Sequence, residues 1–170
     1  PGFLEAIRQH CDASGALLIF DEVVTGFRLG WAGAQGAFGI RPDLTTLGKV
    51  VGGGLPIGAY GGRDDLMAQV APAGPVYQAG TLSGNPISVA AGLATLRQLQ
   101  QPGSYETLDA LGAELAAALE SAAKSAGVPV TVQRAGSMLT PFFTEGEVRN
   151  LDEARRSDTA AYARFFHAML

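Results

Sequence analysis

Short apolar runs alternate with glycine-rich segments along the first hundred residues. Apolar side chains at every third or fourth position predict helices, and uninterrupted apolar runs of about five residues predict buried strands. Asn85 followed by Pro86 predicts a helix start, because asparagine caps a helix and proline is tolerated in its first turn. The predicted elements are a helix over 2–13, strands over 16–20, 44–48 and 57–61, and helices over 64–70 and 85–100. This alternation predicts an α/β domain.

The pattern changes after Gln101-Pro102-Gly103, which we interpret as a domain boundary. The predicted elements beyond it are a helix over 104–125, strands over 128–134 and 137–144, and a helix over 158–170. Their order predicts an α+β unit. We therefore expect residues 1–102 and 103–170 to belong to two domains. The first residue is Pro1 and the last predicted helix has no stop signal, so we expect an internal fragment of a longer protein.

The composition narrows the classes of function. Hydrophobic residues make up 47% of the chain and charged residues 16%, which indicates apolar surface that further chain or a partner covers. The net charge of −4 and the lack of a basic stripe argue against nucleic-acid binding. No apolar run approaches the roughly 18 residues of a membrane span. The single Cys11 suggests a reducing, cytoplasmic compartment, and neither histidine nor cysteine spacing suggests a metal site.

Two charged residues stand at the ends of predicted strands. Asp21 directly follows the 16–20 run, and Lys49 directly follows the 44–48 run and precedes Val50-Val51 and a triple glycine. Ligands of open α/β sheets bind at the carboxyl ends of strands, so both side chains could point into one crevice. A partly desolvated amine is a nucleophile and a proton carrier, and a carboxylate can keep a pyridine nitrogen protonated. Together the two residues suit pyridoxal phosphate, although either alone is more often an ordinary surface residue.

A phosphate site is predicted just before Asn85. The segment Gly80-Thr81-Leu82-Ser83 places hydroxyl and amide donors at the entrance of a helix, where phosphates bind. A capped helix alone would explain Asn85 and Pro86, but not this segment.

Three stretches resemble a known family. Residues 20–28 read FDEVVTGFR and residues 42–59 read PDLTTLGKVVGGGLPIGA, which together resemble the class III aminotransferase family of pyridoxal-phosphate enzymes. Residues 59–63 and 70–86, AYGGR and VAPAGPVYQAGTLSGNP, resemble an aminomutase branch of that family. The resemblance is nearly continuous to about Leu99 and looser beyond. It implies a fold-type-I pyridoxal-phosphate enzyme: part of a large α/β cofactor-binding domain, followed by part of a smaller α+β C-terminal domain.

The resemblance also implies roles for single residues. Lys49 matches the catalytic lysine that forms a Schiff base with pyridoxal 5'-phosphate, and Asp21 matches the residue paired with the pyridine nitrogen. Val23 matches the position packed on the ring face. Gly80 and Thr81 match phosphate contacts that each subunit of a homodimer makes to its neighbour's cofactor.

Five further residues belong to these motifs. Tyr77 and Gln78 lie in the Gly80 segment and are expected near the site. Glu22, Thr25 and Arg28 frame the loop after the first strand, and the sequence predicts no other role for them.

The implied activity is an isomerisation, in which the pyridoxamine and pyridoxal 5'-phosphate forms of the cofactor carry an amino group within glutamate 1-semialdehyde to give 5-aminolevulinate, a tetrapyrrole precursor. An ordinary class III aminotransferase acting on an ω-amine would share Asp21, Lys49 and Thr81. A nucleotide-binding or scaffold domain is a weaker alternative, because no serine or threonine follows Gly48-Lys49. We expect the 170-residue chain alone to be inactive.

Overall fold

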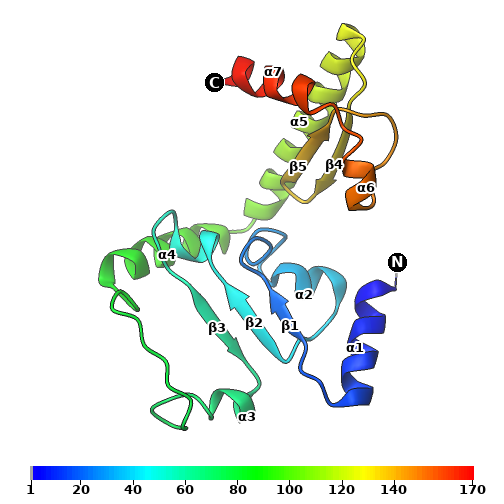
Figure 1. The fold of residues 1–170 in the computed structure, drawn as a ribbon. Helices are drawn as coiled ribbons and strands as arrows, with labels where there is room; N and C mark the ends of the chain where they lie inside the picture. Colours follow the sequence, from blue (N-terminus) through cyan, green and yellow to red (C-terminus); the bar gives the residue numbers. More distant parts are fainter. Residues whose placement is uncertain (1) are drawn as a thin grey trace. The chain divides into compact units, whose positions relative to one another are not determined.

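The computed structural model describes residues 2–170 (Figure 1). They separate into one compact unit up to Ser104 and another from Tyr105. That these units are parts of a large and a small domain of a longer protein stays a prediction.

The first unit is a three-stranded sheet with helices. Its strand order is β1-β2-β3, with β2 parallel to β1 and antiparallel to β3. The predicted α/β fold is therefore confirmed. The elements of this unit are α1 (Phe3–Ser14), β1 (Ile19–Asp21), α2 (Gly33–Phe38), β2 (Leu44–Leu47), the 3₁₀ helix η1 (Lys49–Gly52), β3 (Ala59–Gly62), α3 (Asp64–Met67) and α4 (Pro86–Leu99).

The helix boundaries follow from local chemistry. Gly2 and Gly15, both with positive φ, flank α1. At the start of α4, the Asn85 side chain accepts a hydrogen bond from the Ser88 amide at 2.9 Å, and Pro86 occupies the first turn. The predicted cap and the predicted start of α4 are confirmed.

The prediction of a buried strand over 16–20 is wrong in extent and in burial. Strand β1 has three residues, so Asp21 is its last residue rather than the residue after it. Leu18 is buried, whereas Leu17 and Ile19 are 45% and 55% exposed. The reason is that β1 is an outer strand with one partner, β2, among the described residues.

The other differences in this unit are small. Strand β3 begins two residues later than predicted, because its pairing with β2 starts at Ala59 opposite Leu47. Helix α3 ends at Met67 rather than at residue 70. Helix α2 lies in the segment between the first two predicted strands.

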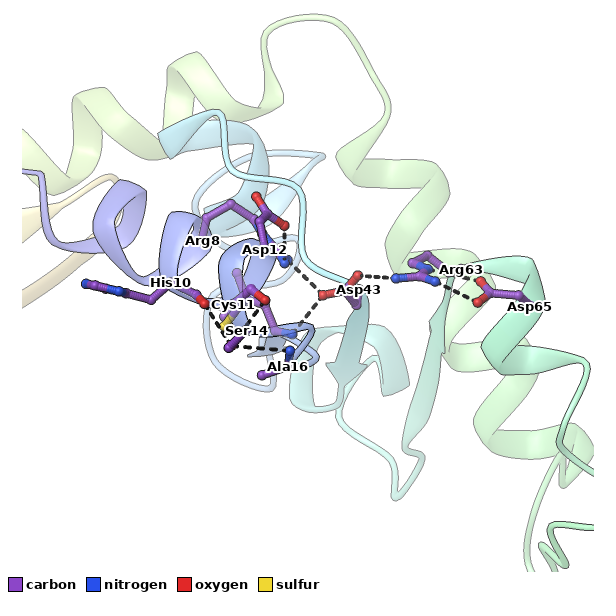
Figure 2. A network of polar contacts seen from close by, with 10 residues as sticks. Arg8, His10, Cys11, Asp12, Ser14, Ala16, Asp43, Arg63 and Asp65 are labelled. Atoms are coloured by element: carbon purple, nitrogen blue, oxygen red, sulfur yellow. Dashed lines mark hydrogen bonds and ion pairs between the residues drawn. The ribbon is translucent and has the colours of Figure 1, made fainter.

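Asp43 joins three elements at the amino end of β2. Its carboxylate accepts hydrogen bonds from the Leu18 amide, from Arg8 in α1 and from Arg63 after β3, each at 2.8 Å; Figure 2 shows both arginine contacts. Arg63 also pairs with Asp65 at 2.6 Å. The hydrogen bond from Leu18, and then those from Arg63 and Arg8, hold the pKa of the Asp43 carboxyl well below its ordinary value.

The second unit is an antiparallel hairpin with helices, as the sequence predicted. Aromatic rings connect the hairpin end to α7: the Phe143 ring lies 6.1 Å from Tyr162 and 5.6 Å from Phe165, between ring centroids. Phe166 and Met169 of the same helix are exposed. The elements are α5 (Ser104–Ala126), β4 (Thr131–Ala135), β5 (Met138–Phe142), α6 (Leu151–Ala154), which was not predicted, and α7 (Thr159–Met169). None of the helices in residues 2–170 has the length and apolar character needed to cross a membrane.

Candidate active site

The carboxyl ends of β1 and β2 meet at one edge of the sheet. The parallel register places Asp21 beside Thr46, and the Glu22 amide continues the ladder by donating to the Thr46 carbonyl at 2.9 Å. Lys49 follows three residues after Thr46 and opens η1. The structure therefore brings Asp21 and Lys49 to the same edge, although they are far apart in the sequence. Their chemical roles stay predictions.

One oxygen of Asp21 is held in place and the other is free. Oδ1 accepts hydrogen bonds from the Val23 amide at 3.0 Å and from the Thr46 hydroxyl at 3.3 Å. Oδ2 forms no hydrogen bond with any residue of the described chain, and the side chain is exposed. This carboxylate is thus oriented by the protein and still able to accept a proton donor from a ligand. Thr46 was missed in the sequence, because its place beside Asp21 depends on the strand register.

Lys49 has an uncommon backbone conformation. Its φ is 46°, and Phe27 is the other non-glycine residue with positive φ in the part of the chain that the structure describes. A left-handed non-glycine residue costs on the order of 1–3 kcal/mol and persists where the surroundings hold it. The Lys49 side chain is exposed and makes no hydrogen bond or ion pair within residues 2–170. Its amine is therefore available to a ligand.

Val23 lies beside the segment that leads into Lys49. A Cβ added to Gly48 would lie 3.2 Å from Val23 Cγ1, which is tighter than most contacts of real side chains. Glycine at position 48 therefore leaves the room that the valine occupies. Asp21, Val23 and Lys49 thus gather at the ends of β1 and β2.

Glu22 is a buried clamp for the loop that follows β1. Its side chain is 1% exposed. Oε2 accepts hydrogen bonds from the Thr25 hydroxyl and the Ala34 amide, both at 2.7 Å, and Oε1 accepts two from Gln35, from N at 2.9 Å and from Nε2 at 3.1 Å. Burial is the largest influence and raises the pKa of the Glu22 carboxyl, but the bonds from Gln35, Ala34 and Thr25 together bring it below its ordinary value. The clamp is therefore ionised.

Gly33 leaves the space that this clamp needs. Its φ is 60°, and a Cβ at this position would overlap the Glu22 carboxylate. The Gln35 side chain continues the network by donating to the Thr45 hydroxyl at 3.3 Å. Sequence reasoning assigned Glu22 no role beyond the motif. Two features of the sequence could have indicated a role for Glu22: it is a second acid directly after Asp21, and Gly33 lies at the start of a short helix.

A hollow of about 520 Å³ lies on the Glu22 side of the sheet, not on the Asp21 side. Its lining includes Glu22, Trp31, Thr45 and Tyr60, and neither Asp21 nor Lys49. Successive side chains of a strand point to opposite faces, so Thr45 faces this hollow while its neighbour Thr46 contacts Asp21. The hollow and the candidate site are therefore separate. No group of three or more histidine, cysteine or acidic side chains in residues 2–170 is arranged to bind a metal.

The predicted phosphate segment lies in an exposed turn. The Ser83 amide donates to the Gly80 carbonyl at 2.9 Å, and Tyr77 is 84% exposed. Gln78, Gly80 and Thr81 are also exposed. No hydrogen bond within the described residues connects 77–81 to Asp21 or Lys49.

Sequence comparison gives one consistent family. The class III aminotransferase model matches residues 1–164. Glutamate-1-semialdehyde 2,1-aminomutases from Desulforudis audaxviator and Pelotomaculum thermopropionicum are 58% and 60% identical over the whole chain. The chain spans 39% of the length of each of these relatives.

Solved structures agree with this result. An ω-transaminase from Sphaerobacter thermophilus matches with a TM-score of 0.82 and 38% identity, over 96% of this chain and 37% of its own. A glutamate-1-semialdehyde aminomutase from Pseudomonas aeruginosa matches with a TM-score of 0.76 and 28% identity, over 92% of this chain and 37% of its own. The family match covers nearly the whole chain. The chain therefore belongs to the class III aminotransferase family.

Proposed function

We propose that this chain forms part of a pyridoxal-phosphate-dependent aminomutase that converts glutamate 1-semialdehyde into 5-aminolevulinate. The observation that carries the proposal is the edge formed by β1 and β2, where an oriented carboxylate with one free oxygen and an unpaired amine gather. The names of relatives that are 58% and 60% identical support the choice of reaction.

The residues at this edge fit pyridoxal phosphate. When bound, the cofactor supplies an aldehyde that bonds to an amine and a ring that withdraws electrons from a substrate carbon. Asp21 would hold a proton on the ring nitrogen with Oδ2, because Val23 and Thr46 already engage Oδ1. Lys49 would bond to the aldehyde and would then move protons at the substrate carbons. The Val23 side chain would pack on the ring.

The proposal includes a homodimer in a reducing, cytoplasmic compartment. Gly80 and Thr81 would contact the phosphate bound by the neighbouring subunit, with Tyr77 and Gln78 near that site. In support, this segment is exposed and has no hydrogen bond to the site of its own chain. Exposed apolar side chains surround it, as expected of a surface that a partner covers: Val76, Tyr77, Leu82 and Ile87. Cys11 is unpaired, which suits a reducing compartment.

An ordinary class III aminotransferase is the second candidate. The ω-transaminase structure is more similar to this chain, at 38% identity, than the aminomutase structure from Pseudomonas aeruginosa, at 28%. The higher identity of the aminomutase sequences outweighs this difference, because it holds over the full 170 residues.

The test is a reaction of the complete enzyme with glutamate 1-semialdehyde and no other amino donor or acceptor. An aminomutase forms 5-aminolevulinate over many turnovers under these conditions, since no second substrate is consumed. An enzyme that stops after one turnover, and resumes when an amino acid or a keto acid is added, is an ordinary aminotransferase and contradicts the proposal.

A further inference from the structure

Helix α4 approaches η1 closely at two glycines, Gly92 in α4 and Gly53 after η1. Gly92 is buried in the middle of α4, and a Cβ there would overlap the carbonyl oxygen of Val51 and lie 3.3 Å from its carbonyl carbon. Glycine inside a helix lowers helix stability relative to alanine, so its presence here needs a reason in the packing. The close approach of the Val51 carbonyl is that reason.

The contact between α4 and η1 is also close at Gly53, on the η1 side. Gly53 directly follows η1 with a φ of 58°, and a Cβ at this position would overlap the Ala91 carbonyl oxygen and lie 2.6 Å from Thr95 Oγ1. Gly92 of α4 thus faces the Val51 carbonyl of η1, and Gly53 after η1 faces the Ala91 carbonyl of α4. A methyl group added to Gly53 or Gly92 would push α4 and η1 apart.

Lys49 is the first residue of this 3₁₀ helix. The helix has four residues, and the Gly53 amide donates to the Val50 carbonyl at 3.0 Å, so its turn is short and closed. Val51, which meets Gly92, lies two residues after Lys49. A left-handed lysine such as Lys49, with its φ of 46°, persists where the surrounding structure holds it.

We propose that Gly92 and Gly53 are positioning residues for Lys49. Their backbone contact sets how closely η1 approaches α4, and so fixes the backbone position of Lys49 at the first residue of η1. This inference rests on the proposed function, because it assigns the contact to the reactive amine. It assigns these two glycines an effect on the reaction rate that acts through Lys49.

The test compares two substitutions in α4 of the complete enzyme. Gly92→Ala adds a methyl group against Val51. The matched control, Ala94→Gly, weakens the same helix at an exposed position without adding an atom near η1. The measurements are the melting temperature, the steady-state constants and the pH at which the visible absorption band of bound pyridoxal phosphate changes. Lys49→Ala in the same assays identifies the part of the band that depends on the lysine.

We expect Gly92→Ala to bind the cofactor and to move the pH midpoint of its band by at least about half a unit, since the lysine environment changes. We expect kcat to fall about tenfold to a hundredfold with KM within about twofold, because a misplaced catalytic group loses rate. Ala94→Gly should lower the melting temperature and leave the pH midpoint unchanged. Equal midpoints and equal kcat in Gly92→Ala and wild type would overturn the inference.

Two other outcomes of these assays also decide the inference. If wild type shows no band that Lys49→Ala removes, both the proposed function and this inference are wrong. If Gly92→Ala does not fold, Thr95→Val decides, because it replaces the hydroxyl beside Gly53 with a larger methyl group and leaves both glycines in place. A midpoint shift in Thr95→Val, without loss of bound cofactor, supports the inference, and an unchanged midpoint overturns it.

Discussion

Asp21 and Glu22 are adjacent in the chain, yet their carboxylates contact opposite faces of the sheet. Asp21 accepts from Thr46, whereas Glu22 shares the Gln35 side chain with Thr45. The alternation of side chains along β2 explains the separation. One acid is exposed with a free oxygen, and the other is buried with both oxygens occupied. Two acids in one motif thus serve different purposes.

Replacing Lys49 with alanine in the complete enzyme should abolish turnover and leave part of the cofactor bound. The reason is that the amine is the group expected to bond to the aldehyde, while other contacts hold the phosphate. Turnover and bound cofactor, measured by absorbance, check this prediction. Lys124→Ala, at an exposed position of α5, is the control. Near-normal activity in Lys49→Ala would contradict the assignment.

Replacing Asp21 with asparagine should lower kcat strongly and leave the melting temperature nearly unchanged, because the charge that we propose keeps the ring nitrogen protonated is lost. Thr46→Val should lower kcat by about fivefold to tenfold, since it removes one hydrogen bond to Asp21 Oδ1. Steady-state kinetics and thermal unfolding of both variants check the prediction. A large drop in melting temperature with normal activity per folded molecule would make Asp21 a structural residue.

The Glu22 clamp should matter more for stability than for chemistry. Glu22→Gln keeps the shape of the side chain but turns an NH₂ donor toward the amide of either Ala34 or Gln35. We expect the free energy of unfolding to fall by about 2 kcal/mol, as for other buried carboxylates that lose their partners. Denaturant unfolding measures it, with the exposed Glu120→Gln as the control. If both substitutions lowered the free energy of unfolding by the same small amount, Glu22 would not stabilise the loop after β1.

The contribution of Asp43 to the stability of the fold should depend on pH. The pKa of its carboxyl is lowered in the folded chain, so its stabilising contribution is complete above the ordinary pKa and is lost as the pH falls toward the folded pKa. The difference in melting temperature between wild type and Asp43→Asn should therefore be largest near neutral pH and shrink between about pH 5 and pH 3. Asp152→Asn, exposed on α6, is the control. A difference that stays constant down to pH 3 would make the charge on Asp43 irrelevant.

The 170-residue chain by itself should not turn over glutamate 1-semialdehyde. It spans 39% of the length of its relatives, and its Gly80 and Thr81 would serve a neighbouring subunit. Incomplete positioning costs several kcal/mol of barrier, on the order of the 7–11 kcal/mol that orientation can contribute. An assay for 5-aminolevulinate with the purified chain tests this. Multiple turnovers at the rate of the complete enzyme would contradict it.

Local sequence patterns predicted the helices and strands better than they predicted the burial and the partners of these elements. The Asn85 cap and the helices around it were found, because capping depends on a few adjacent residues. The burial of Ile19 was wrong, because exposure depends on which strands flank β1. Glu22 and Thr46 were missed for a related reason. Their partners come from segments whose register and loop path exist only after folding.

Asp43 and Asp21 stand at opposite ends of the same strand pair. Asp43 ties α1 and β3 to the amino end of β2, while Asp21 lies at the carboxyl end, where ligands of such sheets bind. We therefore expect substitutions at the amino end of β2 to change mainly stability and substitutions at the carboxyl end to change mainly activity. An engineer who needs a more heat-resistant enzyme can therefore modify the Arg8 and Arg63 end, where added ion pairs lie a full strand away from Lys49.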